Sequence, residues 1–203
     1  MATQAKVKKR DRERTKGKIL KAVGEVIEKY GTEKVGVNLI AREAGVNKVL
    51  IYRYFGGVDG LMEQYVKTGQ YTSTTSLDFI ENLPVPAPED RAKVWIEVLS
   101  KGLQDLRERK ATRDLIRWEI GAGKPVMIDA CNDSSLKMLE KIGELPNYPN
   151  TNPMLAILIG GLYHLAVSAD YRDKFVNVDL QSEEEWKRIE QTMKDIIMAL
   201  DKK

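Results

Sequence analysis

The sequence predicts an all-α protein: a unit of three short helices near the N-terminus is followed by a larger helical domain, with about nine helices in total. Apolar residues recur at helical spacing along most of the chain, as in amphipathic helices. Clusters of glycine and proline separate these stretches. No segment shows the alternation of apolar and polar residues expected of a half-buried strand. We place the domain boundary between residues 1–57 and residues 58–203.

Four helices are predicted in the first third of the chain. The first ends at Gly31, a suitable C-terminal capping residue, and its apolar face contains Ile19, Leu20, Val23, Val26, Ile27 and Tyr30. Glycines separate the next three helices, which are expected over about Val37 to Ala44, Asn47 to Phe55, and from Val58 onward. Asn47 is a favourable N-cap residue for the third of them.

Five helices are predicted in the remainder, after a proline-rich joint at residues 83–88. The last opens on Ser-x-x-Glu, the form of a capping box. A loop rich in proline and asparagine is expected at residues 145–153. The helices cover about Pro88 to Lys110, Thr112 to Ile120, Pro125 to Gly143, Met154 to Ser168, and Ser182 to Leu200.

Charge is distributed unevenly between the two parts of the chain. Residues 1–55 contain 14 Lys and Arg against 6 Asp and Glu, whereas the remainder contains 19 against 24. This favours a basic module that binds phosphates, joined to a mildly acidic body. A basic tail that is merely solvated is the alternative.

The composition excludes several classes of protein. Cys131 and His164 are the only residues of their types, so neither an internal disulfide nor a structural zinc site is expected, and no cofactor is predicted. Neither a nucleophile motif nor a phosphate-binding glycine loop is present, so we do not expect an enzyme. There is no run of 18 apolar residues and no secretory signal, so we expect a cytoplasmic protein without a membrane span.

Residues 35–61 are the most informative segment. Two short helices flank a tight turn at Gly45-Val46, which is a helix-turn-helix arrangement. Ile51 and Phe55 provide the apolar back of the second helix, so its N-terminal end and outer surface are left for the major groove of DNA. The candidate DNA-binding residues are Asn38, Asn47, Lys48, Val49, Leu50, Tyr52, Arg53 and Tyr54.

The same segment resembles the tetracycline-repressor (TetR) family of regulators over about Thr15 to Tyr65. The resemblance is carried by Ile19 and Ala22, by residues 40–46 (IAREAGV), by residues 51–55 (IYRYF) and by Leu61. It implies a homodimer that binds a pseudo-palindromic operator, acts as a ligand-responsive transcriptional regulator, most commonly a repressor, and holds a small-molecule effector in its larger domain. It also implies that Tyr52 and Tyr54 meet phosphates and that residues 47–50 lie near base edges.

Three positions depart from the family pattern. Val49-Leu50 stands where Gly-Thr is common, Gly57-Val58 where Ser-Lys is common, and Val35-Gly36 where threonines are common. Val49 and Leu50 are therefore interpreted either as core residues or as contacts to thymine methyl groups. The basic residues before Thr15 are candidates to replace the missing phosphate contacts.

Two further sites are predicted in the larger domain. Candidates for the effector pocket are Tyr71, Trp95, Trp118, Tyr163 and His164, although all five also suit a core, and His164 an interface. Candidates for the dimer interface are Leu158, Leu162, Ile189, Met193 and Ile196, on the last two helices. A helical interaction module or architectural DNA-binding factor without an effector is the alternative function.

Overall fold

The computed structural model describes residues 2–68, 77–123 and 126–202. Its elements fall into two compact units, one formed by Met1–Tyr71 with Asp114–Met127 and the other by Thr72–Arg113 with Ile128–Lys203. The sequence-based division at residue 57 differs from this grouping, which places the described residues 58–68 with the helices before them.

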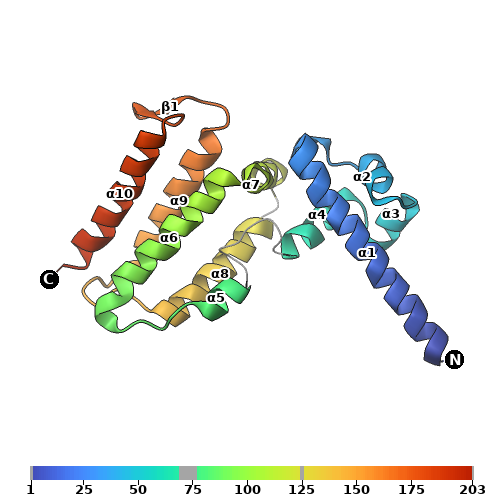
Figure 1. Ribbon diagram of the computed structural model, residues 1–203, viewed down its shortest axis with the longest axis horizontal. Helices are drawn as coiled ribbons and strands as arrows, with labels where there is room; N and C mark the ends of the chain where they lie inside the picture. Colours follow the sequence, from blue (N-terminus) through green and yellow to red (C-terminus); the bar gives the residue numbers. More distant parts are fainter. Residues whose placement is uncertain (1, 69–76, 124–125, 203) are drawn as a thin grey trace. The chain divides into compact units, whose positions relative to one another are not determined.

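The first unit is built on a long N-terminal helix. Figure 1 shows this helix in blue; of the next three helices, the first and the third pack against it, and the second packs against the third. The elements are α1 (Ala2–Tyr30), a 3-10 turn (Thr32–Lys34), α2 (Val37–Ala44), α3 (Val49–Phe55) and α4 (Val58–Lys67). The predicted end of α1 is confirmed, because Gly31 has φ 80° and donates its N–H to the Ile27 carbonyl. Its start was missed: the basic residues expected as a tail belong to α1.

The core of the first unit comes from four helices. The apolar stripe predicted on α1 is buried, except that Tyr30 is exposed and Leu20 is half-buried. Burying such side chains stabilises a fold by about 1.5–3 kcal/mol each. The stripe packs against α2 and α4. The fully buried side chains from the four helices include Ile19, Val23, Val26, Ile40, Ile51, Leu61 and Met62.

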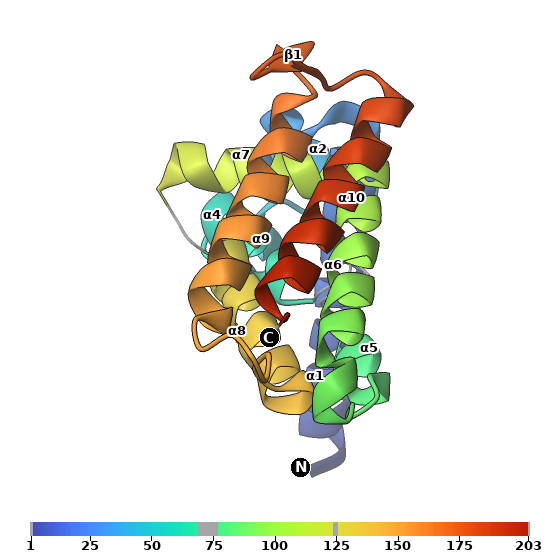
Figure 2. The same ribbon diagram turned by 90° about the vertical axis from the view of Figure 1, so that its left-hand side faces the viewer.

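The second unit is formed mainly by long helices. Figure 2 shows α9 and α10 side by side, with α6 packed against both. The predicted helices are present with small shifts at their ends, and one short helix, α5, was not predicted. The elements are α5 (Leu77–Asn82), a 3-10 turn (Pro88–Asp90), α6 (Arg91–Glu108), α7 (Lys110–Ala122, which continues into the first unit), α8 (Val126–Ile142), α9 (Thr151–Ser168) and α10 (Glu183–Leu200).

Two local features differ from the sequence-based expectation. The proline-containing loop was predicted through Pro153, but α9 already begins at Thr151, because proline is compatible with the first turn of a helix. Two-residue strands, β1 (Lys174–Phe175) and β2 (Val178–Asp179), form a hairpin where no strand was predicted. A strand of two residues is too short to show the alternation of apolar and polar residues by which strands are predicted from a sequence.

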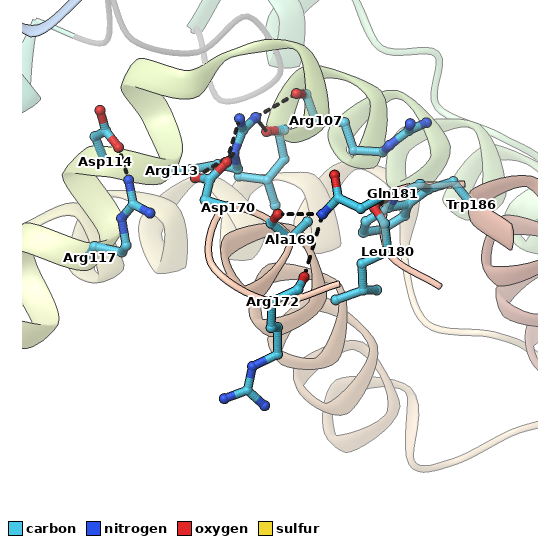
Figure 3. Close-up of polar contacts among 11 residues, drawn as sticks. Arg107, Arg113, Asp114, Arg117, Ala169, Asp170, Arg172, Leu180, Gln181 and Trp186 are labelled. Carbon is cyan, nitrogen blue, oxygen red and sulfur yellow. Dashed lines mark hydrogen bonds and ion pairs between the residues drawn. The ribbon is translucent and has the colours of Figure 1, made fainter. Parts of the chain in front are cut away.

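Polar contacts fix the junctions of the second unit. Arg113 donates two hydrogen bonds to Asp170 Oδ1, from Nε at 3.1 Å and from a terminal nitrogen at 2.9 Å, and a third to the Leu106 carbonyl. Gln181 donates to the Ala169 carbonyl, which ties the chain before α10 to the end of α9 (Figure 3). The capping box is confirmed at Ser182, whose hydroxyl accepts from the Glu185 N–H.

Candidate nucleic-acid interface

The turn between α2 and α3 has the geometry of a helix-turn-helix. Gly45 ends α2 with φ 63°, a conformation that costs a side-chain-bearing residue free energy but not glycine. The N–H of Val46 then donates to the Ala41 carbonyl at 3.0 Å. Ile51 is fully buried, so α3 is anchored by one face while its opposite face stays in solvent.

The N-terminal end of α3 presents a polar, exposed surface. Asn47 Oδ1 accepts the Val49 N–H at 2.9 Å, so its side chain caps the helix start. The ammonium of Lys48 donates to Asn38 Oδ1 at 3.4 Å, which places a residue of α2 beside the start of α3. These three polar side chains are all exposed, and together they form a surface of hydrogen-bonding groups.

The remaining candidates on α3 differ in exposure. Val49 and Tyr52 are 61% and 57% exposed, so the interpretation of Val49 as a core residue is wrong. Arg53 is exposed, whereas Leu50 and Tyr54 are half-buried. The structure therefore brings the eight candidates together around α3, and their contact with DNA stays a prediction.

Two more residues belong to this surface: Arg12, which was expected among the basic residues before Thr15 as a phosphate contact, and Gly60, which sequence reasoning missed. The guanidinium of Arg12 lies over the ring of Tyr54, 5.4 Å from its centroid, a cation–π arrangement. Arg12 lies seven residues before Ile19 and thus on the same face of α1. The sequence would have indicated this placement if the predicted helix had been extended toward the N-terminus. Gly60 is the other: a Cβ there would overlap the Phe55 carbonyl oxygen, so α4 can approach the end of α3 only with glycine at this position.

The predicted effector residues are dispersed. A cavity of about 60 Å³ lies between α6, α8 and α9, and of the five candidates Tyr163 lines it. Trp95 is 1% exposed and donates its indole N–H to the Gly143 carbonyl, as a core residue does. Trp118 belongs to the first unit, and Tyr71 lies outside the described residues.

His164, unlike Trp95, is not a core residue. It is exposed, its ring meets Phe175 edge-on at 5.0 Å between centroids, and its Nε2 lies 3.4 Å from the Ser168 hydroxyl. The cavity's own polar groups are Cys131, Ser135 and Tyr163, and the Tyr163 hydroxyl donates to Cys131 Sγ at 3.5 Å.

The five predicted interface residues do lie together. Leu158, Leu162, Ile189, Met193 and Ile196 all line a groove of about 430 Å³ between α9 and α10. Ile157 on the same groove is 74% exposed. By length and composition α9 is also apolar enough to cross a membrane, a criterion that core helices of other proteins meet as well.

Comparison with known proteins finds a family match within the N-terminal unit. Residues 19–65 match the family model described as bacterial regulatory proteins, tetR family. The HTH-type transcriptional regulator BetI of Vibrio campbellii is 29% identical over 130 residues, which are 64% of this chain and 60% of that protein. BetI of Vibrio parahaemolyticus is also 29% identical, with the same coverage. The match thus spans less than two thirds of these relatives.

Two solved structures share the fold. A TetR-family transcriptional regulator from Haemophilus influenzae superposes with a TM-score of 0.54 at 19% identity, covering 90% of this chain and 95% of the other. The fatty acid degradation regulator FadR from Bacillus halodurans gives 0.58 at 18% identity, covering 88% and 93%. At such identities the likeness concerns the fold.

Proposed function

We propose that this chain, which matches the TetR family of transcription regulators over residues 19–65, is a ligand-responsive repressor that binds a pseudo-palindromic operator as a homodimer. Regulators of this family are DNA-binding proteins and not enzymes. The observation that carries the proposal is the exposed start of α3 on a buried helix-turn-helix scaffold. There Asn47 and Lys48 offer groups for base edges, and Val49 offers an apolar surface for thymine methyl groups.

Phosphate contacts complete the proposed interface. Tyr52 projects from α3 with 57% of its surface exposed, and Arg53 beside it is exposed as well. Phosphate contacts position a protein on the duplex, whereas contacts to base edges give specificity. We assign the first role to Tyr52, Arg53 and Tyr54, and the second to residues 47–50 with Asn38.

Dimerisation is assigned to the groove lined by α9 and α10, two helices that Figure 2 shows side by side. An exposed apolar groove of this size is unfavourable in water, and a second copy of the same two helices would fill it with the same patch from both partners. Glu185 and Arg188 lie at the groove, so a two-fold arrangement offers opposite charges to each other. Two joined copies then present two α3 helices to successive major grooves.

The effector is assigned to the cavity between α6, α8 and α9. The residues lining it include no charged side chain, and its hydrogen-bonding groups are a thiol and two hydroxyls. A neutral, largely apolar small molecule suits such a lining, because an ion would lose its hydration without gaining a partner. The cavity of about 60 Å³ must widen to admit anything larger than a few atoms. Binding that favours the widened state would couple this site to DNA affinity.

Selection of bound duplexes from a random DNA pool tests the proposal directly. We expect an enriched site with two related half-sites about 10 base pairs apart or a multiple of that spacing. Failure to enrich any sequence would contradict operator binding, and a single asymmetric half-site would contradict the homodimer. A thermal-shift screen of neutral metabolites tests the effector, since a ligand of the native state raises stability. If no metabolite does so, an architectural factor without an effector is favoured.

A tyrosine pair offers a matched test of the interface. Tyr52→Phe removes only a hydroxyl, so we expect weaker affinity for the selected duplex and stability changed by less than about 0.5 kcal/mol. Tyr171→Phe in the second unit is the control, because Tyr171 is 58% exposed and should leave DNA affinity unchanged. Equal affinities for the two variants would remove Tyr52 from the interface.

A further inference from the structure

The N-terminal half of α1 is a basic element that the helix-turn-helix does not require. Helix α1, drawn in blue in Figure 1, begins at Ala2, whereas its first buried side chain among those described is Ile19. The side chains of residues 10–18 are exposed or half-buried, so this part of the helix lacks the packing that normally stabilises a helix. Residues 6–21 contain nine lysines and arginines against Asp11 and Glu13.

The cations of this segment are arranged in a way that costs stability. Arg10, Arg14 and Lys18 are spaced four residues apart and all exposed, so they form a row of like charges along one face. Like charges at this spacing destabilise a helix. Anions that lie along such a row would relieve the repulsion between its charges. A spacing of four residues places each cation about 6 Å along the helix axis from the one before.

One contact places this segment beside α3. The Arg12 guanidinium stacks on Tyr54, whose hydroxyl is a proposed phosphate contact. Arginine suits such a position, because its planar group can stack on an aromatic ring and still donate hydrogen bonds to a phosphate. Lys16, one turn further on the same face, is half-buried and pairs with Glu13 at 3.6 Å.

We propose that residues 10–18 of α1 form a second DNA-binding element, which holds the phosphate backbone of the duplex flanking the segment read by α3. This inference rests on the proposed function and adds to it: Arg12, held by Tyr54, joins the two contact surfaces, and Arg10, Arg14 and Lys18 extend them along the strand. Contacts to phosphates do not depend on the DNA sequence, so this element raises affinity for any duplex. It also supplies the phosphate contacts that Gly57-Val58 does not.

The salt dependence of DNA binding tests this proposal without knowledge of the operator. The probe is a 30-base-pair duplex of mixed sequence, and its affinity for the full chain is measured by fluorescence anisotropy over a range of NaCl concentrations. The logarithm of the affinity falls by about 0.9 per phosphate contact for each unit of the logarithm of salt. For the Arg10→Ala, Arg12→Ala, Arg14→Ala triple variant we expect the slope to shrink by about 2 to 3 for each protomer.

Two variants serve as controls. Lys93→Ala, Lys101→Ala, Lys137→Ala removes the same charge from exposed positions of the second unit and should keep the slope of the unmodified chain. Replacing the three arginines by lysine keeps the charge and should restore most of the slope, which excludes a folding defect as the cause.

Equal slopes for the alanine variant and the second-unit control would overturn the inference and leave the proposed function intact. Absence of binding to any duplex by the unmodified chain would overturn the proposed function itself, and this inference with it. If the alanine variant lost binding to phosphatidylserine vesicles but bound the duplex as the unmodified chain does, the segment would be assigned to a membrane surface, and the inference would also be overturned.

Discussion

Replacing Gly60 by alanine is the sharpest test of how α3 is held. A Cβ at this position would overlap the Phe55 carbonyl oxygen and would lie 3.2 Å from the Phe55 carbonyl carbon. Both neighbours are backbone atoms at the end of α3, so no side-chain rotation can relieve the overlap. The two helices must separate, and overpacking of this kind costs about 1–3 kcal/mol or more. The gain in helix propensity from glycine to alanine, about 1 kcal/mol, does not offset it.

Gly17→Ala is the matched control. Gly17 is exposed in the interior of α1, and a Cβ there meets nothing within 4 Å. The same substitution should therefore stabilise the protein by about 0.5–1 kcal/mol. Urea unfolding measures both variants, and anisotropy with the selected duplex reports whether α3 has shifted. The reasoning is refuted if Gly60→Ala is as stable as Gly17→Ala and binds DNA as tightly as the unmodified chain.

Three further predictions concern the second unit. Asp170→Asn should destabilise it by about 1.5–3 kcal/mol, because Arg113 loses a charge-assisted partner at a pair whose side chains are only 13% and 15% exposed; unchanged urea unfolding would contradict this. The double change Ile189→Glu, Ile196→Glu should give monomers with reduced operator affinity, and a folded dimer in light scattering would place the interface elsewhere. A hydrogen bond with Lys194 lowers the pKa of Glu190, so its stabilisation is present above the ordinary value of 4.5 and lost as pH falls through the lowered pKa. Glu190→Gln should remove this small effect, less than about 0.5 kcal/mol for so exposed a pair, and identical pH profiles of stability would refute it.

Local signals in the sequence were sufficient where one residue type decides the geometry. Gly31 and Gly45 adopt positive φ at the ends of α1 and α2, where they were expected, because glycine alone takes that conformation freely. Ser182 caps α10 through the interaction its motif predicts. The alternation of buried Ile51 with exposed Tyr52 follows from helical phase, so the family and the exposed surface of α3 could both be predicted from residues 35–61.

Contacts between distant residues were beyond the sequence. Nothing local distinguishes Trp95, which fills the core, from Tyr163, which lines the cavity, since both are aromatic residues on amphipathic helices. His164 lies in an apolar run and suited a core or an interface, yet its side chain is exposed. The close approach of Gly60 to Phe55 depends on the path of the chain between two helices.

The hairpin and the long α1 illustrate the same division. Val176 and Asn177 both have positive φ at the hairpin tip, an unfavourable conformation for a β-branched residue that no propensity would predict there. Helix α1 was expected to begin near its apolar stripe, and the structure continues it through the basic residues to Ala2. Sequence by itself determined most of the helical segments and which of their faces are apolar or basic, because these depend on neighbours one turn away. Only the tertiary structure decided that Arg12 meets Tyr54, because that pairing depends on how α1 packs over the helix-turn-helix.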